Sequence, residues 1–107
     1  MLTEITVTEL KTQLERGEDI QLIDVREPQE YEICRLPASI LIPLGEIPKS
    51  QHRIAADKPV VVICHHGFRS AQAIQYLSHR FGSHNLLNLK GGIHAWALQV
   101  DPRMAQY

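Results

Sequence analysis

The stretch Val60-Val61-Val62-Ile63-Cys64-His65-His66-Gly67-Phe68-Arg69-Ser70 joins an apolar run to a short polar loop. The four β-branched residues that open it predict a strand that is covered on both faces, as in a parallel sheet. Cys64 follows this strand directly, and a helical pattern begins at Ser70. The sequence therefore predicts a thiol at the point where a buried strand gives way to a helix.

The rest of the chain alternates short apolar runs with helical patterns, which predicts an α/β fold with parallel strands and right-handed crossovers. Thr6 and Glu9 match a capping box that opens a first helix, and Gly17 is suited to end it. Further strands are expected over 20–25, 39–42 and 85–89, and further helices over 44–50, 70–81 and 95–98. In such a sheet, ligands bind beyond the carboxyl ends of the strands, which is where Cys64 is expected.

Length and composition are those of one ordinary domain, with 107 residues, 44% hydrophobic and 21% charged. We expect this domain to span residues 1–100, with a loose C-terminal tail over 101–107. A net charge of −1 gives no field that would recruit nucleic acid or an acidic membrane. No signal peptide and no apolar run of about 20 residues is seen, and two cysteines are too few for a disulfide framework. A monomer in the reducing cytoplasm is the expectation.

The loop that begins at Cys64 has the residues needed to stabilise a thiolate, which is the nucleophilic form of cysteine. A helix start supplies unpaired N–H groups and a positive dipole potential. Gly67 permits the backbone to turn inward, and Arg69 either binds an anionic donor or closes the loop against the scaffold. Ser70 is suited to cap the following helix or to donate its hydroxyl.

Three segments, in order along the chain, resemble the rhodanese-type sulfurtransferases. The family's active loop, C-x-x-G-x-R-S, is matched by Cys64-His65-His66-Gly67-Phe68-Arg69-Ser70. Its first signature is similar to Leu22-Ile23-Asp24-Val25-Arg26-Glu27-Pro28-Gln29-Glu30-Tyr31, continued by Ile42-Pro43-Leu44. Its C-terminal signature is similar to Leu89-Lys90-Gly91-Gly92-Ile93-His94-Ala95-Trp96. Together the three segments extend over nearly the whole chain.

This resemblance implies a five-stranded parallel sheet flanked by helices on both faces. It also implies a double displacement, in which Cys64 takes a sulfane sulfur from thiosulfate or a persulfide donor and holds it as a persulfide. The sulfur then passes to cyanide, a small thiol or a protein cysteine, with no metal or organic cofactor. The substrate would be bound by the loop residues His65, His66, Gly67, Phe68, Arg69 and Ser70.

Two other functions remain as alternatives. One is a module without efficient turnover that relays sulfur to a specific protein or only scaffolds a partner. The other is a cysteine phosphatase or arsenate reductase, because a related phosphatase family uses a similar loop with one more residue between cysteine and arginine. Four residues lie between Cys64 and Arg69, which matches the sulfurtransferase loop and disfavours the phosphatase.

Residues outside the loop support it in the predicted scheme. Arg26 is expected in a structural ion pair, and Asp24 is a candidate to brace the Cys64 loop by accepting N–H bonds. His65 and His66 are expected at the rim of the pocket rather than on a metal, because neighbours on a tight loop rarely point at one ion. The family usually reads Gly-His-Ile-Pro-Gly-Ala after its first signature, whereas this chain reads Cys34-Arg35-Leu36-Pro37-Ala38-Ser39. A local difference in that turn is therefore expected.

Overall fold

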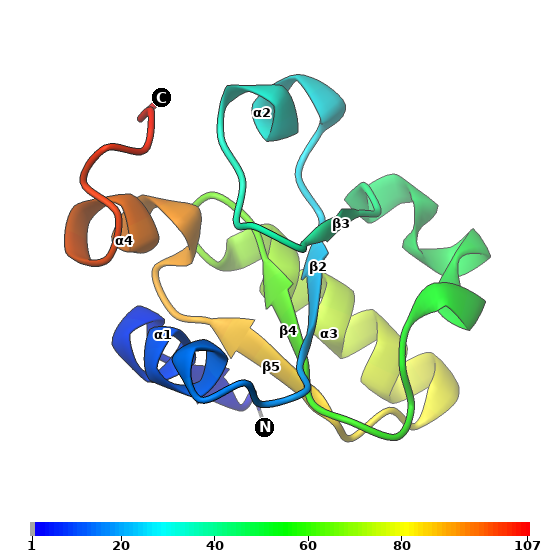
Figure 1. Ribbon diagram of the computed structural model, residues 1–107. Helices are drawn as coiled ribbons and strands as arrows, with labels where there is room; N and C mark the ends of the chain where they lie inside the picture. The colour runs from blue at the N-terminus through cyan, green and yellow to red at the C-terminus, as the bar shows by residue number, and fades with distance from the viewer. Residues whose placement is uncertain (1) are drawn as a thin grey trace.

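The computed structural model describes residues 2–107, which form five parallel strands with helices on both faces (Figure 1). The strands are ordered β1-β5-β4-β2-β3, so β4 lies at the centre of the sheet. In chain order the elements are β1 (Glu4–Ile5), α1 (Val7–Glu15), β2 (Gln21–Asp24), α2 (Pro28–Ile33), β3 (Ile40–Leu41), two 3₁₀ helices (Leu44–Lys49 and Gln51–Arg53), β4 (Val60–Ile63), α3 (Phe68–Phe81), β5 (Leu86–Leu89) and α4 (Gly92–Gln99).

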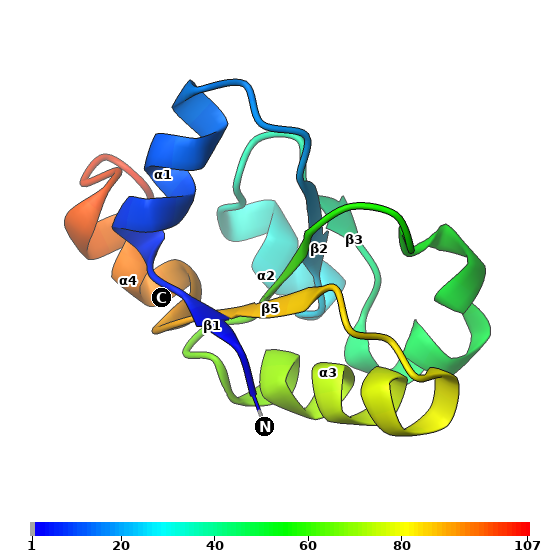
Figure 2. The same cartoon turned by 90° about the horizontal axis from the view of Figure 1, so that it is seen from below.

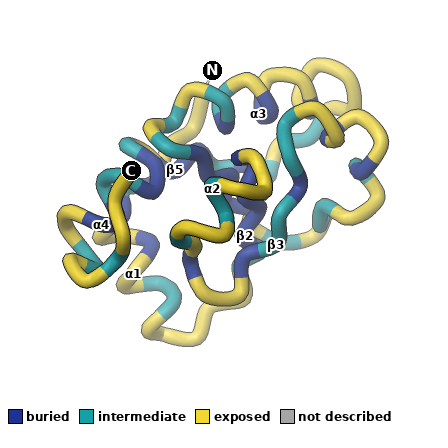
Figure 3. Tube along the Cα trace, turned by 90° about the horizontal axis from the view of Figure 1, so that it is seen from above, coloured by how far each residue is buried: buried dark blue, intermediate teal, exposed yellow. Residues whose placement is uncertain are grey.

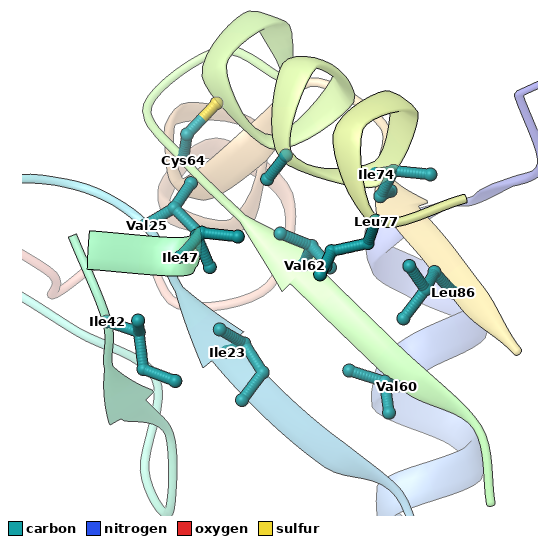
Figure 4. Close-up of a cluster of buried hydrophobic side chains, with 11 residues drawn as sticks. Ile23, Val25, Ile42, Ile47, Val60, Val62, Cys64, Ile74, Leu77 and Leu86 are labelled. Carbon is teal, nitrogen blue, oxygen red and sulfur yellow. The ribbon is translucent and has the colours of Figure 1, made fainter. Parts of the chain in front are cut away.

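The central strand β4 is buried on both faces, as its run of β-branched residues predicts. Side chains alternate across a strand, so Val60 and Val62 pack with Leu77 of α3 on one side. Val61 and Ile63 pack on the other side, in a cluster that includes Leu10 of α1 and Trp96 of α4. Figure 2 shows α3 on one side of the sheet with α1 and α4 on the other, and Figure 4 shows the cluster under α3.

The sequence prediction of the five-stranded α/β fold is confirmed, and most element boundaries lie within two residues of those expected. Thr6 caps α1 in a complete capping box with Glu9. The helix expected from residue 70 begins two residues earlier, and the one expected over 95–98 spans Gly92–Gln99. The sequence did not predict the short edge strand β1, nor the helix α2, which begins at Pro28.

Parallel strands place all their carboxyl ends along one edge of the sheet, where the loops after β2, β4 and β5 meet. The helix α2 follows β2 at this edge and has no fully buried residue, as its exposed trace in Figure 3 shows. The Cys64 loop follows β4 there, and Gly91 leads from β5 into α4. Within residues 2–107, no helix has the length and apolar character needed to cross a membrane.

The turn before β3 contains the one residue other than glycine that has a positive φ within the described chain. Ala38 has φ of +65° at the position where the rhodanese-type pattern has glycine. A left-handed conformation costs a residue with a Cβ atom about 1–2 kcal/mol. The backbone therefore adopts a glycine-like turn in spite of its alanine.

We predict that Ala38→Gly stabilises the protein by about 0.5–1 kcal/mol, because relief of the strained φ outweighs the extra entropy of the unfolded chain. Gly82, which ends α3 at φ of +69° and has open space on the side where a Cβ atom would lie, provides the matched control. Gly82→Ala should lower the free energy of unfolding by about 1 kcal/mol for the same reason. Denaturant titration measures both, and a loss of stability in Ala38→Gly would contradict the prediction.

Candidate active site

Cys64 lies directly after β4 and beside the first turn of α3 (Figure 4). Its side chain is 1% exposed, and its Sγ atom accepts a hydrogen bond from the N–H of Gly67 at 3.0 Å. Gly67 has φ of +106°, which directs this N–H back toward the sulfur and lets α3 begin at Phe68. The thiol is thus held at the positive end of a 14-residue helix, a position that favours a negative charge on sulfur.

Ser70 is the second contact of the sulfur, with its Oγ atom 3.2 Å from Sγ. Ser70 lies in the first turn of α3, and the N-cap residue is Gly67. Of the two roles expected for Ser70, its position therefore allows donation of its hydroxyl but not helix capping. The Ser70 hydroxyl also reaches Asn88 Oδ1, while the Asn88 amide nitrogen donates to the carbonyl of Gly67 at 3.1 Å. Asn88 therefore supports both sulfur contacts, although the sequence analysis did not single it out.

The carbonyl groups of the loop are tied to α4. The N–H of Ile93 donates to the Cys64 carbonyl at 2.9 Å, and the N–H of His94 donates to the His65 carbonyl at 3.1 Å. Such close approach requires glycine, because a Cβ atom on Gly92 would lie 2.4 Å from both carbonyl oxygens. The first turn of α4 thus satisfies the loop carbonyls.

Arg69 does not point freely into an anion site but forms a two-pronged ion pair with Glu30 of α2, at 2.6 and 3.0 Å. The hydrogen bonds from Arg69 lower the pKa of Glu30 to about 2, and the same contact raises the pKa of Arg69. Of the two roles considered for Arg69, this geometry is that of closing the loop against the scaffold. Glu30 was part of the first signature but was not singled out as a site residue.

Arg26 and Asp24 form an ion pair in which both side chains are fully buried. The guanidinium donates to both carboxylate oxygens, from Nε to Oδ1 at 2.9 Å and from Nη2 to Oδ2 at 2.8 Å. Burial opposes the charge on Arg26, yet the hydrogen bonds with Asp24 and Tyr107 raise its pKa. The structural ion pair expected of Arg26 is thus present.

The role expected of Asp24 is wrong. Within residues 2–107, the hydrogen bonds to its carboxylate come from Arg26, including the Arg26 main-chain N–H at 3.0 Å. A buried guanidinium without a partner is far more costly than a loop amide that must find another acceptor. The carboxylate of Asp24 therefore pairs with Arg26 and not with the loop. Asp24 therefore acts on the site only through Arg26.

The C-terminal tail ends at the site, a contact that the sequence did not predict. It returns from α4 toward α2 (Figure 1), and the Tyr107 hydroxyl donates to Glu30 at 2.9 Å and accepts from Arg26 at 2.8 Å. Its ring meets the His65 ring edge-on, with the ring centres 4.2 Å apart. Burial raises the pKa of Tyr107 to about 12, so the hydroxyl keeps its proton and remains a donor.

The loop histidines face a third one. His65, His66 and His94 each place a ring nitrogen within 4.8 Å of the others, although His94 is distant in sequence. Burial, followed by the neighbouring rings of His66 and His94, lowers the pKa of His65. Phe68, the first residue of α3, is 79% exposed. The loop thus presents two imidazoles, and the helix that follows it begins with an exposed aromatic ring.

Comparison with known proteins gives a consistent family assignment. A family model described as "Rhodanese-like domain" matches residues 6–99. A rhodanese-related protein from Thermoplasma volcanium is 32% identical, with a TM-score of 0.81 over 92% of this chain and 93% of that one. A rhodanese-like domain protein from Staphylococcus aureus is also 32% identical, with a TM-score of 0.82 over 89% and 91% of the two chains.

A curated relative in Drosophila pseudoobscura pseudoobscura is the adenylyltransferase and sulfurtransferase MOCS3-1, which is 43% identical over 93 residues. That match takes in 80% of this chain but 21% of the relative. The chain therefore spans about a fifth of the length of the curated relatives of this kind that it matches.

The ion pair of Glu30 with Arg69 predicts a specific pH dependence of stability. The pKa of Glu30 is about 2 in the folded protein against an ordinary value of 4.5, so the pair stabilises the fold fully above pH 4.5. This contribution is lost as the pH falls from 4.5 toward 2. Allowing for the one-third exposure of Arg69, Glu30→Gln should cost about 1–2 kcal/mol near neutral pH.

Denaturant titrations of the wild type and Glu30→Gln from about pH 6 to pH 3 measure this difference directly. The stability gap between the two proteins should narrow as the pH falls. A gap that stays constant over this range would mean that the carboxylate charge does not stabilise the fold.

Proposed function

The chain belongs to the rhodanese-like domain family of sulfurtransferases, and we propose that it moves a sulfane sulfur from thiosulfate or a persulfide donor to a thiophilic acceptor. The single observation that carries this proposal is the contact between the Cys64 sulfur and the Gly67 N–H at the start of α3. It gives a negative sulfur a main-chain donor and a helix dipole at the same point. A reducing compartment such as the cytoplasm would keep this thiol free.

In the first half-reaction the Cys64 thiolate attacks the outer sulfur of thiosulfate. A new S–S bond forms on Cys64 while the S–S bond of thiosulfate breaks, and sulfite leaves with the bonding electron pair. The product is a persulfide anion on Cys64, so the total charge is unchanged. The Gly67 N–H already donates to the sulfur, and we expect it and the neighbouring loop amides to stabilise the terminal sulfur, because main-chain N–H groups stabilise an anion well.

In the second half-reaction the acceptor attacks the terminal sulfur of the persulfide. Cyanide would leave as thiocyanate, and a thiolate would leave as a new persulfide. In both cases the bond to Cys64 breaks and its electron pair returns to the thiolate. No group other than the covalent cysteine is needed to carry the sulfur.

Ser70 is suited to follow the charge on sulfur through this cycle. When Cys64 is a thiol, the Ser70 hydroxyl is free to donate to Asn88, as its position against Oδ1 allows. When Cys64 is a thiolate, the same hydroxyl can turn its proton toward Sγ over the 3.2 Å that separates them. Hydrogen bonds to a charged group are worth about 1.5–3 kcal/mol, so this rotation favours the reactive form.

A second candidate, relay of sulfur between proteins, is favoured by two features of the same loop. Arg69 is already paired with Glu30, which leaves its charge largely neutralised toward a dianion such as thiosulfate. Phe68 is 79% exposed beside the reactive residue, and an aromatic side chain in that position is suited to anchor a protein partner. The curated MOCS3-1 relative is itself named as an adenylyltransferase and sulfurtransferase.

Intact-mass analysis tests the persulfide directly. After brief treatment with thiosulfate, the wild type should gain the mass of one sulfur atom, and cyanide should remove it with formation of thiocyanate. Cys34→Ser, which changes the other cysteine of the chain, should keep the adduct, and Cys64→Ser should lose it. An adduct that survives in Cys64→Ser, or disappears in Cys34→Ser, would contradict the assignment.

The relay candidate predicts that a persulfide-loaded cysteine desulfurase fills Cys64 faster than an equal concentration of thiosulfate does. Phe68→Ser should slow loading from the protein donor by about tenfold, the effect of losing an interface contact of about 1.4 kcal/mol. Loading from thiosulfate should change much less. Phe81→Ser, at the far end of α3, is the matched control. An equal loss of loading rate with the protein donor and with thiosulfate would reject the relay hypothesis.

A further inference from the structure

The three histidines of the site lie on two separate elements, and the backbone fixes their separation. His65 and His66 belong to the Cys64 loop, whereas His94 lies in the first turn of α4. The main-chain hydrogen bond from His94 to the carbonyl of His65 holds the two elements at contact distance. The close approach at Gly92 makes this arrangement a property of the fold rather than of side-chain rotation.

The three rings form a compact triangle. Their centres are 4.2 Å apart for His65 and His66, 5.0 Å for His66 and His94, and 5.9 Å for His65 and His94. The Tyr107 ring packs edge-on against His65 and limits its rotation. His66 is exposed, so it can turn toward the other two rings at little cost. One ring is thus held in place and another is free to adjust.

Three imidazoles at this spacing have the chemistry of a metal site. Metal–nitrogen bonds of about 2.0–2.1 Å in a tetrahedral site place nitrogen atoms about 3.3 Å apart. The ligand atoms here lie within 4.8 Å of one another, so small rotations of the rings bring them to that spacing. Imidazole nitrogen suits zinc, copper and nickel, whereas magnesium and calcium prefer oxygen.

The sequence predicted no metal on His65 and His66, but it did not place His94 beside them. We propose that His65, His66 and His94 together bind one divalent transition-metal ion of the zinc class, on the rim beside the Cys64 loop. Three protein ligands leave the fourth tetrahedral position open to water or to a small anion. The buried sulfur of Cys64 is not among the ligands, because it is directed to Gly67 and Ser70. This inference goes beyond sulfur transfer and does not depend on it.

Calorimetric titration of the full chain, without a histidine tag, with zinc chloride tests the site. A Cys64→Ser background removes the thiol as a ligand and cannot form a persulfide, so the result is independent of the proposed function. We expect one ion per chain with a dissociation constant in the micromolar range or tighter, and no binding of magnesium. Titration with cobalt chloride should give the visible absorption of a four-coordinate site.

His94→Gln and His66→Gln should each raise the dissociation constant for zinc by about tenfold or more, because each removes a ligand. His66 is exposed, so its substitution should leave thermal unfolding unchanged, which separates loss of a ligand from loss of the fold. His79→Gln and His84→Gln change exposed histidines elsewhere and should bind zinc as the parent does. Equal affinity in His94→Gln and His84→Gln, or no binding at millimolar zinc, would overturn the proposal.

Discussion

The buried ion pair between Asp24 and Arg26 is the interaction on which the reactive end of the molecule depends. Asp24 ends β2, and Arg26 extends from it to the carbonyl of Cys34 at 2.6 Å and to the Tyr107 hydroxyl at 2.8 Å. One guanidinium thereby joins the sheet, the end of α2 and the C-terminal tail. Removing one partner of such a pair typically costs about 3–5 kcal/mol, because it leaves a buried charge without compensation.

From this pair, a chain of contacts leads outward to the reactive loop. Arg26 holds Tyr107, Tyr107 donates to Glu30, and Glu30 binds Arg69. The positive start of α3 and the single N–H bond from Gly67 then act on the sulfur itself. Most of the polar groups at this edge therefore hold the loop in shape, and few touch the reacting atom.

Sequence alone predicted the sheet, the position of Cys64 and the family, because these rest on local patterns. The run of β-branched residues over 60–63 is a local signal, and so is the motif that follows it. The contacts of Glu30 with Arg69 and of Tyr107 with Arg26 join residues 39 and 81 positions apart, and no periodicity marks them. The helix α2 was not predicted for a different reason. Its first residue is a proline, which ends strands but is also favoured in the first turn of a helix, so it does not by itself indicate which element follows.

The hydrogen bonds between α4 and the loop carbonyls fix the orientation of the loop backbone at the reactive residue. The carbonyls of Cys64 and His65 are held by Ile93 and His94, so the peptide groups of this part of the loop cannot turn over. The N–H groups of this part of the loop are therefore the ones left to bind a ligand. Cys64 itself is 1% exposed. Covalent inhibitors of this cysteine should therefore be small, narrow and negatively charged, and bulky neutral alkylating reagents should be excluded even where the thiol is fully reactive.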